Sequence, residues 1–199
     1  MASTIKTVTK NDIITLPNLR LRQRSSKVNF VTPEIKQLVH DMQAATIDWE
    51  NSRQHEVGVA LAAIQIDQPY RVVVIRNNFD DKTDHSFTVF INPIITKYEG
   101  HLQSDYEGCL SVKNIYGMVP RYSKVRVKAM GIDGREFRVT AENFMARIFQ
   151  HEIDHTNGIV FVDHIRDDPS AFYKLATKGD LEPLEYDVVI KDNTDLWEE

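Results

Sequence analysis

Two histidines and the chain's only cysteine are the residues whose types and spacing could do chemistry. His151 and His155 stand four residues apart in the segment HEIDH, and Cys109 stands far from them in the sequence. Side chains four positions apart on a helix project to the same side, so two imidazoles at that spacing can bind one metal ion. A thiolate as the third ligand would leave a coordination position open, which distinguishes a catalytic metal site from a structural one. The pattern therefore indicates a metallohydrolase.

Glu152 follows the first histidine and is a candidate general acid and base. Water bound to a metal ion has its pKa lowered from ~15.7 toward ~7. A carboxylate within hydrogen-bond reach can accept that proton and later pass it to a leaving amine. A glutamate in a surface salt bridge is the alternative. Asp154 in the same segment could orient a ligand or pair with an arginine, or be a plain surface charge.

Cys109 lies in the segment EGCLS. Gly108 allows the backbone to bend or approach closely, and Leu110 offers a backbone N–H beside the thiolate. Gln65 ends a segment of small residues, GVALAAIQ, and its amide could donate to a developing oxyanion. For Cys109, the alternatives are a buried apolar cysteine and a cysteine nucleophile that leaves the histidines idle. For the segment that ends at Gln65, the alternative is a tight turn that leads into a packed strand or helix.

Both histidines fall in a segment, 141–156, that has the pattern of an amphipathic helix. Thr140 is the expected N-cap, and neither glycine nor proline interrupts the segment before Gly158. At ~100° per residue, one narrow stripe contains Phe144, Ile148, His151 and His155. The histidines thus extend an apolar face, and both should point into the protein, where an unpaired imidazole costs free energy.

The chain before this helix combines an arm, a second helix and several strands. Residues 1–31 are expected to form an irregular arm with short extended pieces. A helix should begin at Pro33 after the N-cap Thr32 and end near Asn51. Strands are expected at 71–76, 87–92, 125–130 and 136–139, and a hairpin turn at Asp133-Gly134 joins the last two.

After the histidine helix, we expect a short helix at 169–178, a strand at 186–191 and a solvated acidic end at 192–199. Strands that cluster ahead of one central helix favour an α+β fold. A length of 199 residues suits a single domain with a full core.

Composition excludes several classes of function. The net charge of −5 gives no basic surface for nucleic acid or an anionic membrane. No apolar run approaches the ~18 residues of a membrane span, and the start of the chain lacks the apolar core of a secretory signal. A single cysteine excludes an intramolecular disulfide and fits a reducing compartment, the cytoplasm or an organelle.

Three segments, in this order, resemble the peptide deformylase family. The family carries Gly-x-Gly-x-x-x-x-Gln, Glu-Gly-Cys-Leu-Ser and Gln-His-Glu-x-Asp-His. This chain has GVALAAIQ at 58–65, EGCLS at 107–111 and QHEIDH at 150–155, and the likeness extends from about Leu21 to Asp163. The resemblance implies mixed and antiparallel sheets packed around a central metal-binding helix. It also implies one catalytic domain over 1–199, with a C-terminal extension from about residue 180.

The activity implied by the resemblance is removal of the N-formyl group from the initiator methionine of new polypeptides, with release of formate. Cys109, His151 and His155 would hold one divalent ion, with Glu152 as acid and base. The family favours Fe²⁺, with Zn²⁺, Ni²⁺ or Co²⁺ also found, whereas the ligand set alone suits zinc equally well. The implied partners are N-formylmethionyl nascent chains at the ribosome.

The resemblance also assigns roles around the metal. Gln65 and the backbone N–H of Leu110 would stabilise the oxyanion, and Glu107 would pair with an arginine, for which Arg121 is the candidate. The stripe geometry adds an apolar pocket for the methionine side chain. The expected substrate-binding residues are Gly58, Val59, Ala60, Glu107, Gly108, Phe144 and Ile148. Ala60 replaces the family's second glycine, and its methyl group could weaken substrate binding or shift specificity.

Two other functions fit parts of the pattern. A zinc peptidase of the His-Glu-x-x-His type would take its third ligand from His164, Glu182 or Glu185. That hypothesis leaves EGCLS and Gln65 without a role. A module that binds peptide N-termini without turnover is the second alternative, with Ala60 as the sign of lost activity.

Overall fold

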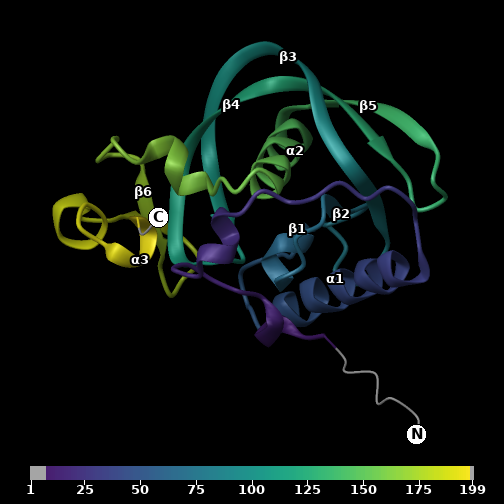
Figure 1. The fold of residues 1–199 in the computed structure, drawn as a ribbon. Helices are drawn as coiled ribbons and strands as arrows, with labels where there is room; N and C mark the ends of the chain where they lie inside the picture. The colour runs from purple at the N-terminus through teal and green to yellow at the C-terminus, as the bar shows by residue number, and fades with distance from the viewer. Residues whose placement is uncertain (1–7, 198–199) are drawn as a thin grey trace, which may run out of the picture.

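The structure is a computed structural model and describes residues 8–197. Helix α2, Asn143–Thr156, lies beneath the long arching strands β3 and β4 (Figure 1). Helix α1, Pro33–Asn51, packs on the other side of β1 and β2. The strands thus separate the two main helices, and the α+β fold with a central helix is confirmed.

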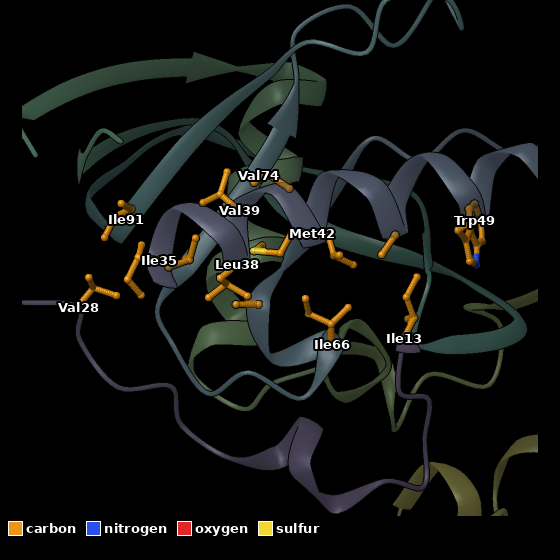
Figure 2. Close-up of a cluster of buried hydrophobic side chains, with 14 residues drawn as sticks. Ile13, Val28, Ile35, Leu38, Val39, Met42, Trp49, Ile66, Val74 and Ile91 are labelled. Atoms are coloured by element: carbon orange, nitrogen blue, oxygen red, sulfur yellow. The ribbon is translucent and has the colours of Figure 1, made fainter. Parts of the chain in front are cut away.

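Helix α1 begins and ends where the sequence predicts. Thr32 caps it through a hydrogen bond from the Ile35 N–H at 3.4 Å, and Pro33 occupies the first turn, where its missing N–H costs nothing. Its apolar face covers β1 and β2 (Figure 2). This face includes Ile35, Leu38, Val39, Met42 and Trp49.

The described strands form one seven-stranded sheet with antiparallel pairing throughout. Its order is β1 (Ala60–Ala62), β2 (Val72–Arg76), β3 (Phe87–Cys109), β4 (Val112–Met130), β6 (Phe172–Leu175) and β7 (Leu181–Pro183). Strand β5, Glu136–Glu142, pairs with β4 beside this path. Short 3₁₀ helices are η1 (Lys10–Asp12), η2 (Leu19–Arg22), η3 (Ala63–Ile66) and η4 (Phe161–Ile165).

Strands β3 and β4 are far longer than the predicted 87–92 and 125–130. The register shifts several times between them, for example between Ile91 and Ile94 and between Glu99 and Leu102. Each bulge inserts an unpaired residue, which breaks the alternation of apolar and polar side chains that reveals a strand in sequence. The extra length matters for function, because it places Cys109 at the end of β3.

Helix α2 begins at Asn143, two residues after the predicted start. Thr140 lies within β5, opposite Arg126, so its prediction as the N-cap was wrong. Glu142 precedes the helix and makes no side-chain capping hydrogen bond. The pairing of β5 with β4 overrides the local capping preference of Thr140, because a ladder position satisfies its backbone groups instead.

The C-terminal predictions were wrong in type. Strand β6 replaces the helix expected at 169–178, and a π-helical turn, Tyr186–Ile190 (η5), replaces the strand expected at 186–191. Phe172 explains the first error, since it pairs with Gly117 of β4 and is buried. Leu196, in α3 (Thr194–Trp197), is also buried, so the solvated end is wrong over α3, while residues 198–199 lie outside the described part.

Within residues 8–197, helices are too short or too polar to cross a membrane. Packing of the C-terminal segment joins it to the rest of the domain. One hydrophobic cluster contains Val119 of β4, Phe161 of η4, and Phe172 and Leu196 of the C-terminal segment. The chain after β6 therefore packs against β4 and η4.

Candidate active site and metal centre

The fold brings the cysteine and the two histidines together. Cys109 Sγ lies 3.2 Å from His155 Nε2. The ligand atoms of Cys109, His151 and His155 all lie within 4.8 Å of one another, and no other such trio of candidate ligands occurs among residues 8–197. One sulfur and two ring nitrogens are the donors that Zn²⁺ and the softer first-row metals accept. The donor set therefore fits one divalent metal ion.

Glu107 fixes the orientation of one histidine. Its Oε2 lies 2.9 Å from His151 Nδ1, which leaves Nε2 of that ring for a metal. Arg121 donates through Nε and Nη2 to the two carboxylate oxygens at 2.9 and 3.0 Å, so the expected ion pair is present. Burial opposes ionisation of Glu107, but the hydrogen bonds from His151 and Arg121 outweigh it and hold its pKa well below the usual range.

Arg147 is a second buried guanidinium on the same carboxylate, and it was not among the predicted site residues. Its Nη1 donates to Glu107 Oε1 at 2.8 Å and to the Val119 carbonyl at 2.7 Å. Its Nη2 donates to the Gln103 carbonyl at 2.7 Å. The signal was available, because Arg147 stands four residues before His151 and so shares its face of the helix.

Asp154 pairs with an arginine, one of the roles considered for it. Its Oδ2 accepts from Arg121 Nη1 at 2.5 Å and lies 2.7 Å from His164 Nε2. Arg121 therefore connects the carboxylates of Glu107 and Asp154, one from β3 and one from α2. This connection holds the end of β3 against the helix that carries both histidines.

Gln65 lies on η3 and its side chain is directed at the cysteine. Its Oε1 accepts the Ala62 N–H at 2.8 Å, which fixes which end of the amide faces the site. Its Nε2 lies 3.1 Å from Ser111 Oγ and 3.5 Å from Cys109 Sγ. Ser111, whose N–H also lies 3.4 Å from that sulfur, is a further site residue that was not predicted. A buried amide in this position can donate to an oxygen bound beside the sulfur.

Glu152 is 5% exposed, and its Oε2 has no hydrogen-bond partner within the described residues. Burial raises the pKa of Glu152 to about 7, and the charge of Glu107 also raises it while His151 acts in the opposite direction. A buried carboxyl oxygen without a partner is costly unless something polar completes it. A water molecule held by the neighbouring metal ion would do so, which is a second sign that the site fits a metal.

A cavity of about 370 Å³ opens beside these groups. Cys109, His151, Glu152 and Gln65 line it. Of the expected substrate-binding residues, six also line it, namely Val59, Ala60, Glu107, Gly108, Phe144 and Ile148. Its volume falls within the ~300–1,000 Å³ typical of ligand sites.

Gly58 is the expected substrate-binding residue that does not line the cavity. A Cβ atom there would lie 2.8 Å from the Thr46 backbone oxygen, so the glycine permits close packing against α1. Its N–H donates to Glu50 Oε2 at 2.9 Å, and that oxygen also accepts from Arg76 Nη1 at 2.5 Å. Gly58 therefore links the cavity-lining strand β1 to a buried ion pair.

Comparison with known proteins agrees with this geometry. A family model described as polypeptide deformylase matches residues 10–170. The chain belongs to the peptide deformylase family. A peptide deformylase of Nitrobacter hamburgensis is 39% identical over 157 residues, covering 77% of this chain and 86% of that protein. One from Thermomicrobium roseum is 40% identical over 158 residues, covering 78% and 85%.

Solved structures of peptide deformylases share the fold. That of the Legionella pneumophila enzyme has a TM-score of 0.68 at 38% identity and covers 79% of this chain and 85% of that chain. That of a Synechococcus elongatus enzyme in complex with actinonin has a TM-score of 0.69 at 31% identity and covers 80% of both chains. The protein is accordingly a hydrolase, a peptide deformylase, and its reaction is removal of the formyl group from an N-terminal formylmethionine.

Family membership does not favour the zinc peptidase alternative. The third ligands considered for it do not join the histidines in the described structure, where the ligand group consists of Cys109, His151 and His155. His164 contacts Asp154 and Arg121 instead. Membership of the peptide deformylase family implies a divalent metal ion, and Cys109, His151 and His155 form the candidate site for it.

Proposed function

We propose that Cys109, His151 and His155 hold one ferrous ion, and that Glu152 is the acid and base of deformylation. The observation that carries this proposal is the unpartnered Oε2 of Glu152 beside three converging ligand atoms. When bound, the ion supplies Lewis acidity toward the formyl oxygen and lowers the pKa of a coordinated water. Glu152 accepts a proton from the attacking water and delivers it to the leaving amine nitrogen of methionine.

Two donors stabilise the negative charge that develops on the formyl oxygen. They are the Gln65 amide and the backbone N–H of Leu110, the residue after Cys109. Support for Gln65 comes from its Nε2, which already lies among polar groups at the site, 3.5 Å from Cys109 Sγ. Each such donor contributes ~3 kcal/mol to transition-state stabilisation.

The methionine side chain lies against the α2 end of the cavity. Val59, Phe144 and Ile148 line the cavity and are apolar. Ala60, 6% exposed on β1, lines the same cavity, and its methyl group narrows the approach of the substrate backbone relative to a glycine. We therefore expect activity with altered preferences, since the ligands, Glu152 and Gln65 are all in place.

The cellular setting extends this proposal. Residues 1–199 act as one catalytic domain on N-formylmethionyl chains as they leave the ribosome, in the cytoplasm. Bacterial relatives such as those of Nitrobacter and Thermomicrobium support a cytoplasmic setting. The packing of Phe172 and Leu196 with Val119 supports a single domain that includes the C-terminal extension.

Formate release decides the proposal. The protein, purified without oxygen and loaded with Fe²⁺, is incubated with formyl-Met-Ala-Ser, and both formate and bound iron are measured. Turnover at one iron per chain supports the proposal. Peptide binding without formate release supports the module without turnover, and turnover by iron-free protein contradicts the metal assignment.

A further inference from the structure

Part of the cavity wall lies outside the segment that matches the family model. The match ends at residue 170, whereas Leu175 of β6, Leu181 of β7 and Gly179 between them line the cavity. We propose that this β6–β7 hairpin contacts the side chain of the substrate residue after formylmethionine and selects for apolar side chains there. The inference rests on the proposed function, because it concerns the substrate of the same site.

The hairpin is fixed to the rest of the domain. Phe172 at the start of β6 pairs with Gly117 of β4 and is 1% exposed. A Cβ atom at Gly117 would lie 2.5 Å from Ile165 Cδ1 and 2.8 Å from Phe161 Cε2, so glycine lets β4 pack closely against η4 at this position. The Tyr173 ring packs edge-on against Tyr106, which itself lines the cavity, with ring centres 4.9 Å apart. A wall held in this way keeps its position, as selective contact with a ligand requires.

The hairpin forms a part of the cavity wall that is separate from the α2 residues of the methionine pocket. Leu175 also lines a smaller cavity of about 100 Å³ next to Cys109, and no described residue of α2 lines that smaller cavity. Phe144 and Ile148, on α2, line the main cavity but not this smaller one, so the hairpin and α2 form different parts of the wall. Side chain and main chain leave a Cα atom in different directions. A peptide whose methionine side chain lies against α2 can thus place its next residue against the hairpin.

The register of the hairpin sorts its side chains by chemistry. Leu175 stands opposite Leu181, and Lys174 stands opposite Glu182. Successive side chains of a strand point to opposite faces, so the two leucines share one face and the charged pair shares the other. Lys174 Nζ and Glu182 Oε2 lie 3.5 Å apart, which pairs the charges with each other. The face toward the cavity is therefore apolar and favours an apolar substrate side chain over a charged one.

Charge substitutions at Leu181 test the inference through substrate preference. Leu181→Lys and Leu181→Glu are assayed, as iron-loaded enzymes, on formyl-Met-Leu-Ser, formyl-Met-Asp-Ser and formyl-Met-Lys-Ser. Each variant should lose about tenfold in kcat/KM on the leucine peptide. In Leu181→Lys, kcat/KM for the aspartate peptide should rise relative to kcat/KM for the lysine peptide. Leu181→Glu should show the reverse preference. Val188→Lys, at a position 77% exposed in η5, is the matched control and should keep the wild-type order.

A uniform loss on all three peptides, or an unchanged order of preference, would overturn the inference. Leu175→Lys repeats the test if Leu181→Lys does not fold, as judged by its melting temperature. Failure of the proposed function gives a different result, because wild-type enzyme then releases no formate from any peptide. In that case, the affinities of the variants for the same peptides are measured by calorimetry. The preference between the aspartate and lysine peptides should again reverse between the two charge variants.

Discussion

Arg147 Nη1 lies 2.8 Å from Glu107 Oε1, and both side chains are almost completely buried. The other oxygen of this carboxylate faces His151 Nδ1 at 2.9 Å. Arg147 and His151 stand one helical turn apart on α2, so the helix presents to Glu107 both a cation and a metal-ligand candidate. The carboxylate from β3 therefore orients a ring on α2 while Arg147 compensates its charge.

Replacement of Arg147 tests this arrangement. Arg147→Met removes a buried cation and leaves the carboxylate with fewer donors, so His151 should be held less firmly. We expect metal affinity to fall ~10- to 100-fold, the usual effect of losing an outer partner of a metal ligand. Competition with a chelator measures it. Arg135→Met is the control, since Arg135 is 88% exposed, and equal affinities in the two variants would contradict the role of Arg147.

Removal of the Gln65 amide should affect the chemical step. Gln65→Met removes the donor at Nε2, and we expect kcat to fall ~10²- to 10³-fold, as for a lost oxyanion donor. Metal content should stay at one ion per chain, because no ligand changes. Gln37→Met is the matched control, since Gln37 is exposed on α1 and its side chain donates a hydrogen bond to Asp41. A change in KM alone would remove Gln65 from its assigned role.

Glu152→Ala should abolish turnover while the metal stays bound. The reason is that the substitution removes the proton carrier and leaves Cys109, His151 and His155 unchanged. Formate release and metal content, measured on the same sample, check both halves. Retention of most activity would show that another group moves the proton.

Enlargement of Ile148 should block the methionine pocket. Ile148 is buried and lines the cavity, so Ile148→Trp should raise KM for formyl-Met peptides by ~10-fold or more. Ile132→Trp, at an exposed position between β4 and β5, controls for the added bulk. An unchanged KM would count against the proposed lining.

The buried pair of Glu50 and Arg76 gives a prediction about stability. Their contact of 2.5 Å is buried on both sides, and Glu50 also accepts the Gly58 N–H. Glu50→Ala leaves a buried guanidinium and a backbone N–H without that partner, and should lower the free energy of unfolding by ~3–5 kcal/mol. Urea denaturation measures the change. Glu136→Ala, which breaks an exposed pair with Lys128, should change it little, and similar losses in both variants would refute the prediction.

The site was predictable where chemistry and helical periodicity coincide. His151 and His155 share a face because the helix repeats every 3.6 residues, and Cys109 and Gln65 stand in short segments with recognisable composition. The lengths of β3 and β4 were not predictable, because bulges interrupt the alternation on which strand prediction depends.

Long-range contacts account for the remaining differences. Phe172 is extended because β4 offers a partner at Gly117, and nothing within 169–178 itself records that partner. The two guanidiniums on Glu107 come from β4 and α2, so only the folded chain assembles them. The candidate metal ligands could therefore be recognised from local sequence, whereas the residues that surround them are brought there by tertiary contacts.

The absorption spectrum of the Co²⁺-loaded protein tests the central claim most directly. A thiolate bound to Co²⁺ gives an intense near-ultraviolet charge-transfer band, which oxygen and nitrogen ligands do not give. The wild-type protein should show this band, Cys109→Ser should lack it, and His164→Ala should retain it. A band that persists in Cys109→Ser, or that is absent from the wild-type protein at full metal loading, would contradict a site built from Cys109, His151 and His155.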